Sequence, residues 1–137
     1  MTRIAEGFRP VSRPRPNPFN DMIGPFYERR QDDDVSLGLR IEERHCNSRG
    51  ICHGGLLSAL ADVALGYATL AKTKGPTSFV TVQLSMDFAG AAKPGDWVES
   101  EADVQQAGMR LAFANGYLLV GDKRIVRASA IFALSGK

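Results

Sequence analysis

The chain has 137 residues, of which 44% are hydrophobic and 23% are charged, and its formal net charge is +2 at pH 7. These values are typical of a soluble globular domain, and the length favours one domain around a single core. A net charge this small gives no reason to expect a nucleic-acid-binding face, which needs a basic patch that neutralises several phosphates. Small acidic molecules remain open as ligands.

The first 18 residues form a segment rich in arginine and proline. Prolines fix extended backbone and remove amide donors, so we expect this arm to lie across the surface or to be mobile. The prolines are Pro10, Pro14, Pro16 and Pro18. No apolar run of the length that defines a secretory signal occurs there. We therefore predict an N-terminal arm over residues 1–18 and a single domain over residues 19–137.

The longest apolar stretch covers residues 56–71. It is shorter than the roughly 20 residues that a membrane span needs, and polar residues such as Asp62 interrupt it. We expect a core helix and no membrane insertion. The two cysteines, Cys46 and Cys52, are too few for a disulfide scaffold and fit a reducing compartment, so we expect the cytoplasm.

Hydrophobic periodicity predicts strands on both sides of this helix. After a short apolar turn at residues 19–23, two alternating segments predict a hairpin around an acidic turn at residues 32–34. Apolar residues then recur at helical spacing, and Gly75-Pro76 stops the helix. The predicted strands are residues 26–31, 35–43, 79–89, 97–105, 111–120 and 124–134. This order predicts an α+β fold in which an antiparallel sheet of five to six strands wraps around one long helix.

A polar loop leads into the predicted helix through His53, Gly54 and Gly55. The first amides of a helix have no internal partner and carry the positive end of the dipole, so they can hold an anion or a developing oxyanion. Two successive glycines remove side-chain bulk and let a substrate carbonyl approach. This is an oxyanion hole in outline, although a Gly-Gly pair before a helix is more often only a tight turn.

Asp62 lies within the most apolar stretch of the chain, where an unpaired carboxylate is costly to bury. The Asp62 carboxylate is solvated, forms an ion pair with an arginine, or has a catalytic role. We favour the catalytic role. Asp62 follows Gly54 by eight residues, or about 12 Å along a helix. If both act on one carbonyl, the two groups must come from different subunits of a two-fold dimer with antiparallel helices.

These residues form a spaced motif, which reads Asn47-x-x-Gly50-x-x-His53-Gly54-Gly55 followed by Asp62. The motif resembles the signature of hot-dog-fold acyl-CoA thioesterases, particularly the phenylacetic-acid-pathway type in the 4-hydroxybenzoyl-CoA thioesterase superfamily. The resemblance extends over about residues 17–134. It implies a hot-dog fold and a homodimer, often a tetramer, with active sites at the dimer interface. Acyl-CoA would be the substrate, and no separate cofactor is expected because CoA is part of the substrate.

The resemblance also implies roles for single residues. Gly54 would supply the amide that polarises the thioester carbonyl, and Asn47 would orient substrate or water. Asp62 of the second subunit would be general base or nucleophile, and the sequence does not choose between the two. Thr81 stands where relatives have a serine or threonine that helps to position the attacking water. His53 would be mainly structural or would help to aim the carbonyl.

Further residues are candidates for binding the substrate. Gly50 and Gly55 belong to the motif loop and its junction with the helix. CoA carries phosphates, so basic groups are needed near the mouth of the site, and Lys93, Arg110 and Arg127 are candidates. Each of these three could equally be a solvated charge at a turn or a strand edge.

Other functions compete with hydrolysis. The main alternative is a non-catalytic hot-dog domain that binds acyl-CoA as a sensor, which the presence of Asp62 disfavours. A hot-dog dehydratase is disfavoured because no histidine follows His53. A metal site from His45, Cys46, Cys52 and His53 is disfavoured because adjacent side chains rarely converge on one ion. A Cys46 nucleophile beside His45 lacks a third, orienting group.

Overall fold

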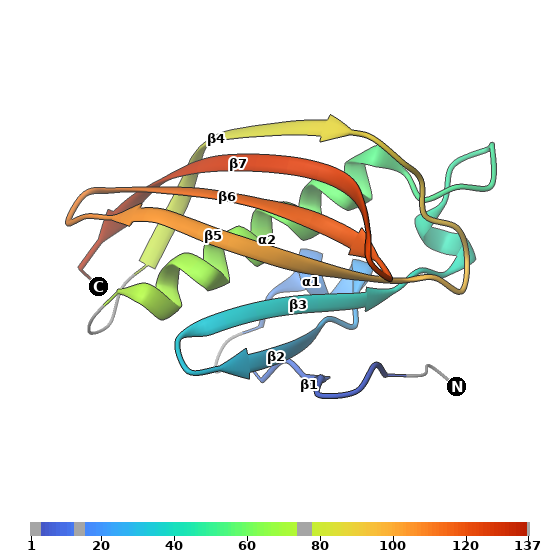
Figure 1. Ribbon diagram of the computed structural model, residues 1–137, viewed down its shortest axis with the longest axis horizontal. Coiled ribbons are helices and arrows are strands. Elements are labelled where there is room, and N and C mark those ends of the chain that lie inside the picture. The colour runs from blue at the N-terminus through green and yellow to red at the C-terminus, as the bar shows by residue number, and fades with distance from the viewer. Residues whose placement is uncertain (1–3, 13–15, 74–77, 137) are drawn as a thin grey trace.

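The computed structural model describes residues 4–12, 16–73 and 78–136, and its seven-stranded antiparallel sheet curves around one long helix (Figure 1). The elements in chain order are β1 (Arg9–Pro10), α1 (Pro18–Ile23), β2 (Tyr27–Gln31), β3 (Asp34–Arg40), the 3-10 turn η1 (Glu43–His45), α2 (Gly54–Lys72), β4 (Ser78–Phe88), β5 (Trp97–Ala107), β6 (Leu111–Val120) and β7 (Lys123–Ser135). This is the α+β hot-dog architecture that the resemblance implies.

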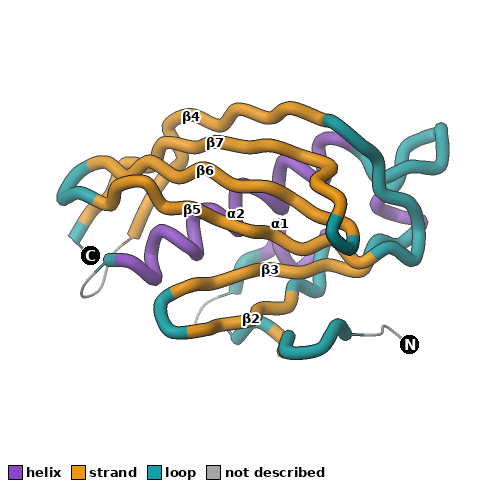
Figure 2. Tube along the Cα trace, in the orientation of Figure 1, coloured by secondary structure: helices purple, strands orange, loops and turns teal. Residues whose placement is uncertain are grey.

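The strands lie in the order β1-β2-β3-β5-β6-β7-β4, and every neighbouring pair is antiparallel. Helix α2 runs behind the sheet in the view of Figure 2, so one sheet face packs on the helix and the other faces outward. The two edge strands are β1 and β4. The order places β4, which follows α2 directly in the chain, at the edge farthest from β1.

Part of the arm joins the sheet, which is why seven strands form instead of the predicted five to six. Strand β1 pairs with β2 through Arg9 and Pro10. The neighbouring Phe8 is only 8% exposed and meets the Trp97 ring edge-on at 5.2 Å between centroids. The guanidinium of Arg29 lies 4.6 Å from the centroid of the Phe8 ring. This part of the arm therefore lies across the surface and packs on the domain.

The first two elements of the domain differ from the prediction at their ends. Residues 19–23 form helix α1 instead of an apolar turn, because Pro18 occupies the first turn and the Asn17 side chain caps it by accepting a hydrogen bond from Asn20 N at 3.2 Å. The second predicted strand, residues 35–43, ends three residues early at Arg40. The chain there turns into η1, whose ends are joined by reciprocal hydrogen bonds between Glu42 and His45.

Helix α2 extends one to two residues beyond each end of the predicted segment and forms the centre of the core. Its apolar side is buried against the sheet through Leu57, Leu60, Ala61, Ala64, Leu65 and Ala68. By length and composition α2 would also qualify as a membrane span, but half of it is buried within the fold, as in a core helix. The predicted stop at Gly75-Pro76 lies outside the described residues.

Glycine in α2 determines how closely β4 approaches it. A Cβ at Gly66 would lie only 2.3 Å from Cζ of Phe79 on β4, closer than any side-chain contact permits. The Phe79 ring continues into the core, where it meets Phe132 edge-on at 5.0 Å between centroids. Glycine at position 66 therefore allows β4 to pack closely against α2. This packing brings side chains of β4 next to the side of α2 that carries Asp62.

Candidate active site

His53 caps the start of α2. Its Nδ1 accepts a hydrogen bond from Gly55 N at 2.8 Å, and this bond occupies one of the amides that a helix start leaves without an internal partner. A Cβ at Gly55 would lie 2.9 Å from that same Nδ1. The position of the His53 ring therefore leaves no room for a side chain at residue 55. The Gly55 amide already donates to that ring and is not available to a substrate. The geometry gives His53 and Gly55 a structural task at the helix start.

Gly54 presents the open amide. Among the described residues, its N–H finds no acceptor, and it points out of the positive end of a 19-residue helix. A Cβ at Gly54 would lie 3.4 Å from Cζ of Phe88, an aromatic residue that is 52% exposed. Gly54 thus combines an unused hydrogen-bond donor with an adjoining apolar surface. Such an amide can stabilise a developing oxyanion.

The loop before α2 is folded around Asn47. Oδ1 of Asn47 accepts a hydrogen bond from Arg49 N at 2.9 Å, and its carbonyl accepts one from Gly50 N at 3.0 Å. Gly50 has a φ of +78°, in the left-handed region that favours glycine, so it is needed for the turn. The Asn47 amide oxygen is therefore engaged within the loop, while its NH₂ group is the part that remains to contact a ligand.

His45, for which the sequence suggests only the roles of metal ligand or partner of Cys46, is buried and anchors this loop. Nδ1 of His45 accepts from Glu42 N at 2.9 Å, and Nε2 donates to the Ile23 carbonyl at 2.7 Å. The carbonyl of His45 accepts from His53 N at 2.9 Å, so the same residue joins α1, the loop and the start of α2. Burial lowers the pKa of His45 from its ordinary value of 6.5, which favours the neutral ring that these two bonds require.

Asp62 and Thr81 meet between α2 and β4. Oγ1 of Thr81 donates a hydrogen bond of 2.6 Å to Oδ1 of Asp62, which is half-buried on the flank of the helix. Within residues 4–12, 16–73 and 78–136, Asp62 forms no ion pair with an arginine, and the Thr81 hydroxyl keeps it from being isolated among apolar side chains. A hydroxyl that donates to one carboxylate oxygen orients the carboxylate and leaves its other oxygen available to accept a proton.

Strand β4 contains a β-bulge next to Thr81. Thr81 pairs with Phe132 and Gln83 with Ile131, so Val82 is the extra residue in β4. The simple alternation predicted over residues 79–89 is wrong beyond this point, because the bulge exchanges the two faces of the strand. Phe79 and Thr81 before it, and Leu84, Met86 and Phe88 after it, all lie on the side of α2.

The candidate site lies along an open edge of the fold. Strand β4 flanks α2 with Phe88 beside Gly54 and Thr81 beside Asp62. In the part of the chain that the structure describes, β4 is the last strand at this edge of the sheet. Val80 and Val82 on this strand are 66% and 59% exposed. An exposed apolar edge strand is a template for pairing with another chain.

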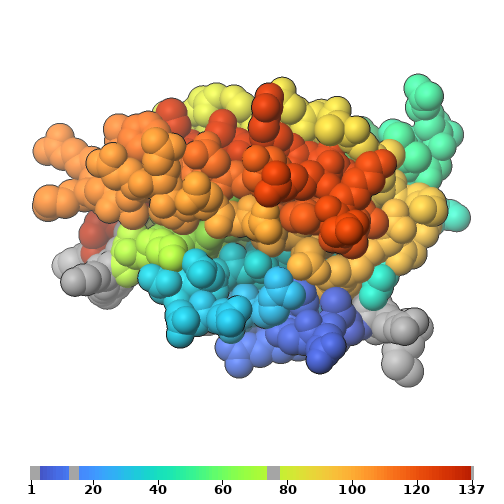
Figure 3. Space-filling model, viewed as in Figure 1, coloured from blue at the N-terminus to red at the C-terminus, as the bar shows by residue number. Residues whose placement is uncertain are grey.

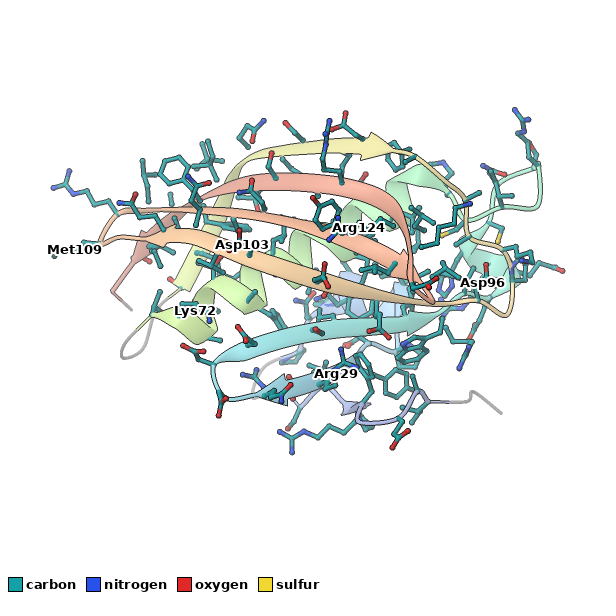
Figure 4. The ribbon with its side chains drawn as sticks, viewed as in Figure 1. Arg29, Lys72, Asp96, Asp103, Met109 and Arg124 are labelled. Atoms are coloured by element: carbon teal, nitrogen blue, oxygen red, sulfur yellow. The ribbon has the colours of Figure 1, made fainter. Side chains whose placement is uncertain are left out.

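The structure brings only one of the three basic candidates near the loop of the same chain. Lys93 adjoins it, because the carbonyl of Ala92 accepts from Cys52 N at 2.7 Å. Arg110 follows Met109 in the hairpin between β5 and β6, at the opposite end of the sheet from Asp96, as Figure 4 shows.

Arg127 lies on the outer face of the sheet, away from α2. It forms an ion pair with Asp87 at 3.0 Å and lines a cavity of about 540 Å³ together with residues of β4, β5 and β6. This outer face is the one turned toward the viewer in Figure 3. Within one chain, Arg127 and the Gly54 amide therefore open onto different surfaces.

No metal site is found in residues 4–12, 16–73 and 78–136, where no group of three or more histidine, cysteine or acidic side chains could hold an ion. Both ring nitrogens of His45 are used in hydrogen bonds. The groups that the candidate site presents are the Gly54 amide, the Asp62 carboxylate and the Thr81 hydroxyl.

A family model covers the part of the chain that carries these residues. The model described as "Thioesterase superfamily" matches residues 49–124, more than half of the chain. The match includes Gly54, Asp62 and Thr81. The chain belongs to the thioesterase superfamily. A Pseudomonas aeruginosa protein named "Putative esterase PA0474" is 44% identical over 135 residues, which cover 98% of this chain and 99% of that protein. Human "Acyl-coenzyme A thioesterase 13" is 32% identical over 81 residues, and this match covers 59% of this chain and 57% of that protein.

Solved structures show the same fold at low sequence identity. The PaaI protein from the phenylacetic acid degradation operon of Escherichia coli superposes with a TM-score of 0.77 and 19% identity, over 88% of this chain and 86% of that one. A protein from Streptococcus pneumoniae described as "Hypothetical Thioesterase Protein", solved with coenzyme A, gives a TM-score of 0.74 and 18% identity, over 82% and 87% of the two chains. The hot-dog fold of thioesterases is thus established for this member of the superfamily.

Proposed function

We propose that this thioesterase-superfamily protein hydrolyses an acyl-CoA thioester to the free acid and CoA. The observation that carries the proposal is the combination of an open Gly54 amide at the start of α2 with the Thr81–Asp62 hydrogen bond of 2.6 Å on the same helix flank. Acyl transfer to water needs a donor for the developing oxyanion and a group that takes a proton from water or attacks the carbonyl. These residues supply both.

The reaction follows from these groups. The thioester carbonyl accepts a hydrogen bond from Gly54 N–H, and negative charge that develops on its oxygen is stabilised by the helix dipole. Asp62 either removes a proton from water as the water attacks, or attacks the carbonyl itself to give an anhydride that water then opens. The CoA thiolate leaves and takes up a proton. Thr81 holds the carboxylate in one orientation in both routes.

We propose that each site is shared between two copies of the chain. Gly54 and Asp62 of one α2 are eight residues, or about 12 Å, apart along the helix, so they cannot serve one carbonyl together. A second copy that adds its β4 to the β4 edge would cover Val80 and Val82 and bring its own α2 alongside in the opposite direction. Asp62 of one copy would then lie near Gly54 of the other.

Acyl-CoA as the substrate is supported by two relatives. One is named for acyl-coenzyme A thioesterase activity, and another was solved with coenzyme A. Lys93 adds a cationic group next to the loop of the site, where a CoA phosphate would be attracted. No separate cofactor is needed for this chemistry, because CoA enters as part of the substrate.

Thiol release from a panel of aromatic, short-branched and medium-chain acyl-CoAs tests the proposal. We expect turnover of at least one class, and we expect Asp62→Asn to lower kcat by about 10²- to 10⁴-fold. The matched control is Asp103→Asn, which removes an exposed carboxylate on β5 and is expected to leave kcat unchanged. Binding of acyl-CoA without turnover of any member of the panel would favour the alternative function, a non-catalytic acyl-CoA sensor.

A further inference from the structure

Cys46 and Cys52 stand directly opposite each other at the two ends of the site loop. They form an isolated antiparallel bridge. The hydrogen bonds on either side of the pair run from Asn47 N to the Ile51 carbonyl and from His53 N to the His45 carbonyl, each 2.9 Å long. Cys46 and Cys52 themselves exchange no backbone hydrogen bond, so they form the narrow type of antiparallel pair.

This type of pair suits a cross-link. Opposite residues in a narrow pair have Cα atoms about 4.5 Å apart and side chains on the same face. Disulfides span Cα separations of about 4.4–6.8 Å. Both cysteine side chains pack on the same core, and both are free thiols. The spacing of the two backbone segments therefore suits a disulfide between these side chains.

The two thiols differ in access. Cys52 is 5% exposed, whereas Cys46 is half-buried and reaches solvent. Burial raises the pKa of Cys52 to about 12, and the nearby Cys46 adds to the shift. A reagent in solution therefore meets Cys46 first, and Cys52 is the residue that would resolve an adduct formed there.

We propose that Cys46 and Cys52 form a reversible disulfide that closes the loop of residues 47–51. The oxidant is a low-molecular-weight disulfide. The Cys46 thiolate attacks one sulfur of this reagent and displaces its other half as a thiol, which leaves a mixed disulfide on Cys46. Cys52 then loses its proton and attacks the Cys46 sulfur, and the second half of the reagent departs as a thiol. Two protein thiols become one disulfide while one small disulfide becomes two thiols.

The cross-link would act on the proposed site because of its place in the chain. Cys46 directly precedes Asn47, and Cys52 directly precedes His53, the cap of α2. A disulfide withdraws the Cys46 thiol from the Glu42 carbonyl and the Cys52 thiol from the His53 carbonyl, and small displacements of positioning groups can cost large factors in rate. The effect on turnover rests on the proposed function; formation of the disulfide does not.

Trypsin offers a direct assay, because Arg49 lies between the two cysteines. The purified protein is treated with glutathione disulfide, its remaining thiols are alkylated, and it is digested. We expect peptides 45–49 and 50–72 to stay joined until a reductant is added. The variants Cys46→Ser and Cys52→Ser yield no joined pair. Glutathione on Cys46 alone, or joined peptides found only in chains linked to each other on a denaturing gel, would overturn the proposal.

Two further readouts separate the disulfide from its consequence. The melting temperature of the oxidised protein should rise by about 5 °C and return on reduction, because a closed loop constrains the unfolded chain. Turnover of acyl-CoA should fall about tenfold on oxidation and recover with reductant, while Cys46→Ser is insensitive. If the reduced protein turns over no acyl-CoA, the proposed function fails while the joined peptide still decides this proposal. If the cross-linked protein turns over acyl-CoA at the same rate as the reduced protein, the proposed effect of the disulfide on the site is contradicted.

Discussion

The Thr81 hydroxyl reaches across from edge strand β4 to Asp62 on helix α2, with 2.6 Å between Oγ1 and Oδ1. The bulge at Val82 lets Thr81, which precedes it, share the helix side of β4 with Leu84 and Met86, which follow it. The hydrogen bond fixes the carboxylate in one orientation, with its second oxygen open. The orientation of Asp62, which we propose acts on water or substrate, therefore depends on how β4 is positioned in the sheet.

Removing the Thr81 hydroxyl should therefore lower kcat while the fold is kept. A hydrogen bond to a charged group contributes about 1.5–3 kcal/mol, so Thr81→Val is expected to reduce kcat by about 10- to 100-fold. Thr81→Ser keeps the hydroxyl and should retain most of the activity. Equal losses in the two variants, measured by thiol release, would show that the hydroxyl is not what matters at this position.

The two glycines at the start of α2 should respond differently to alanine. Gly55→Ala places a Cβ 2.9 Å from Nδ1 of His53, so it should displace the capping ring and lower the free energy of unfolding by about 1 kcal/mol. Gly54→Ala makes only an ordinary contact with Phe88 and should cost little stability. Gly54→Ala should still lower kcat, because its methyl group crowds the open amide. Urea unfolding and thiol release on both variants separate the two effects.

His45 should make stability depend on pH. Burial lowers its pKa below the ordinary 6.5, and the Arg44 guanidinium lowers it further, against the opposing effects of the Ile23 carbonyl and Glu42. The unfolded chain then binds a proton more readily than the folded one, so stability is full above pH 6.5 and is lost as pH falls toward the lowered pKa. Protonation of Nδ1 also removes the acceptor for Glu42 N.

Urea unfolding above and below pH 6.5 checks this dependence. In the variant His45→Gln, which retains His53, the free energy of unfolding should change less with pH than in the wild type. The chain contains only these two histidines, so the comparison isolates His45. A variant with the same pH dependence as the wild type would assign the effect to other groups.

Phe8 should contribute to stability although it belongs to the N-terminal arm. It is 8% exposed and packs edge-on against Trp97. Phe8→Ala is expected to lower the free energy of unfolding by about 3 kcal/mol. Ile4→Ala, in the same arm but 40% exposed, should cost less than about 0.5 kcal/mol. Similar losses for both, measured by urea unfolding, would mean that the contact between Phe8 and Trp97 is not maintained in solution.

Much of the fold was predictable because periodicity reflects burial. Val35, Leu37, Leu39 and Ile41 alternate in the sequence, and each is at most 3% exposed. The strand predicted over residues 111–120 matches β6 at both ends. What periodicity does not reveal is a change of phase within a strand. The alternation through β4 looks regular in the sequence, and only the pairing with β7 shows that Val82 is an extra residue.

The candidate site was predictable where local sequence determines it. Gly54 at a helix start and Asp62 within the helix follow from spacing along one element. The contact between Asp62 and Thr81 joins residues 19 positions apart on two elements, so it depends on how β4 packs on α2. The anchoring by His45 depends on the Ile23 carbonyl, 22 residues earlier, and no pattern in the sequence indicates it.

The shared site is tested most directly by mixing two inactive variants, Asp62→Asn and Asn47→Ala. Half of the dimers that form from an equal mixture contain one of each chain, and each such dimer has one intact site. Acyl-CoA thiol release should therefore recover to about a quarter of the wild-type rate. A chain with both substitutions, mixed with Asp62→Asn, should recover nothing. If subunit exchange is verified by native mass spectrometry and the mixture is no more active than its components, the account of a site shared between two copies is contradicted.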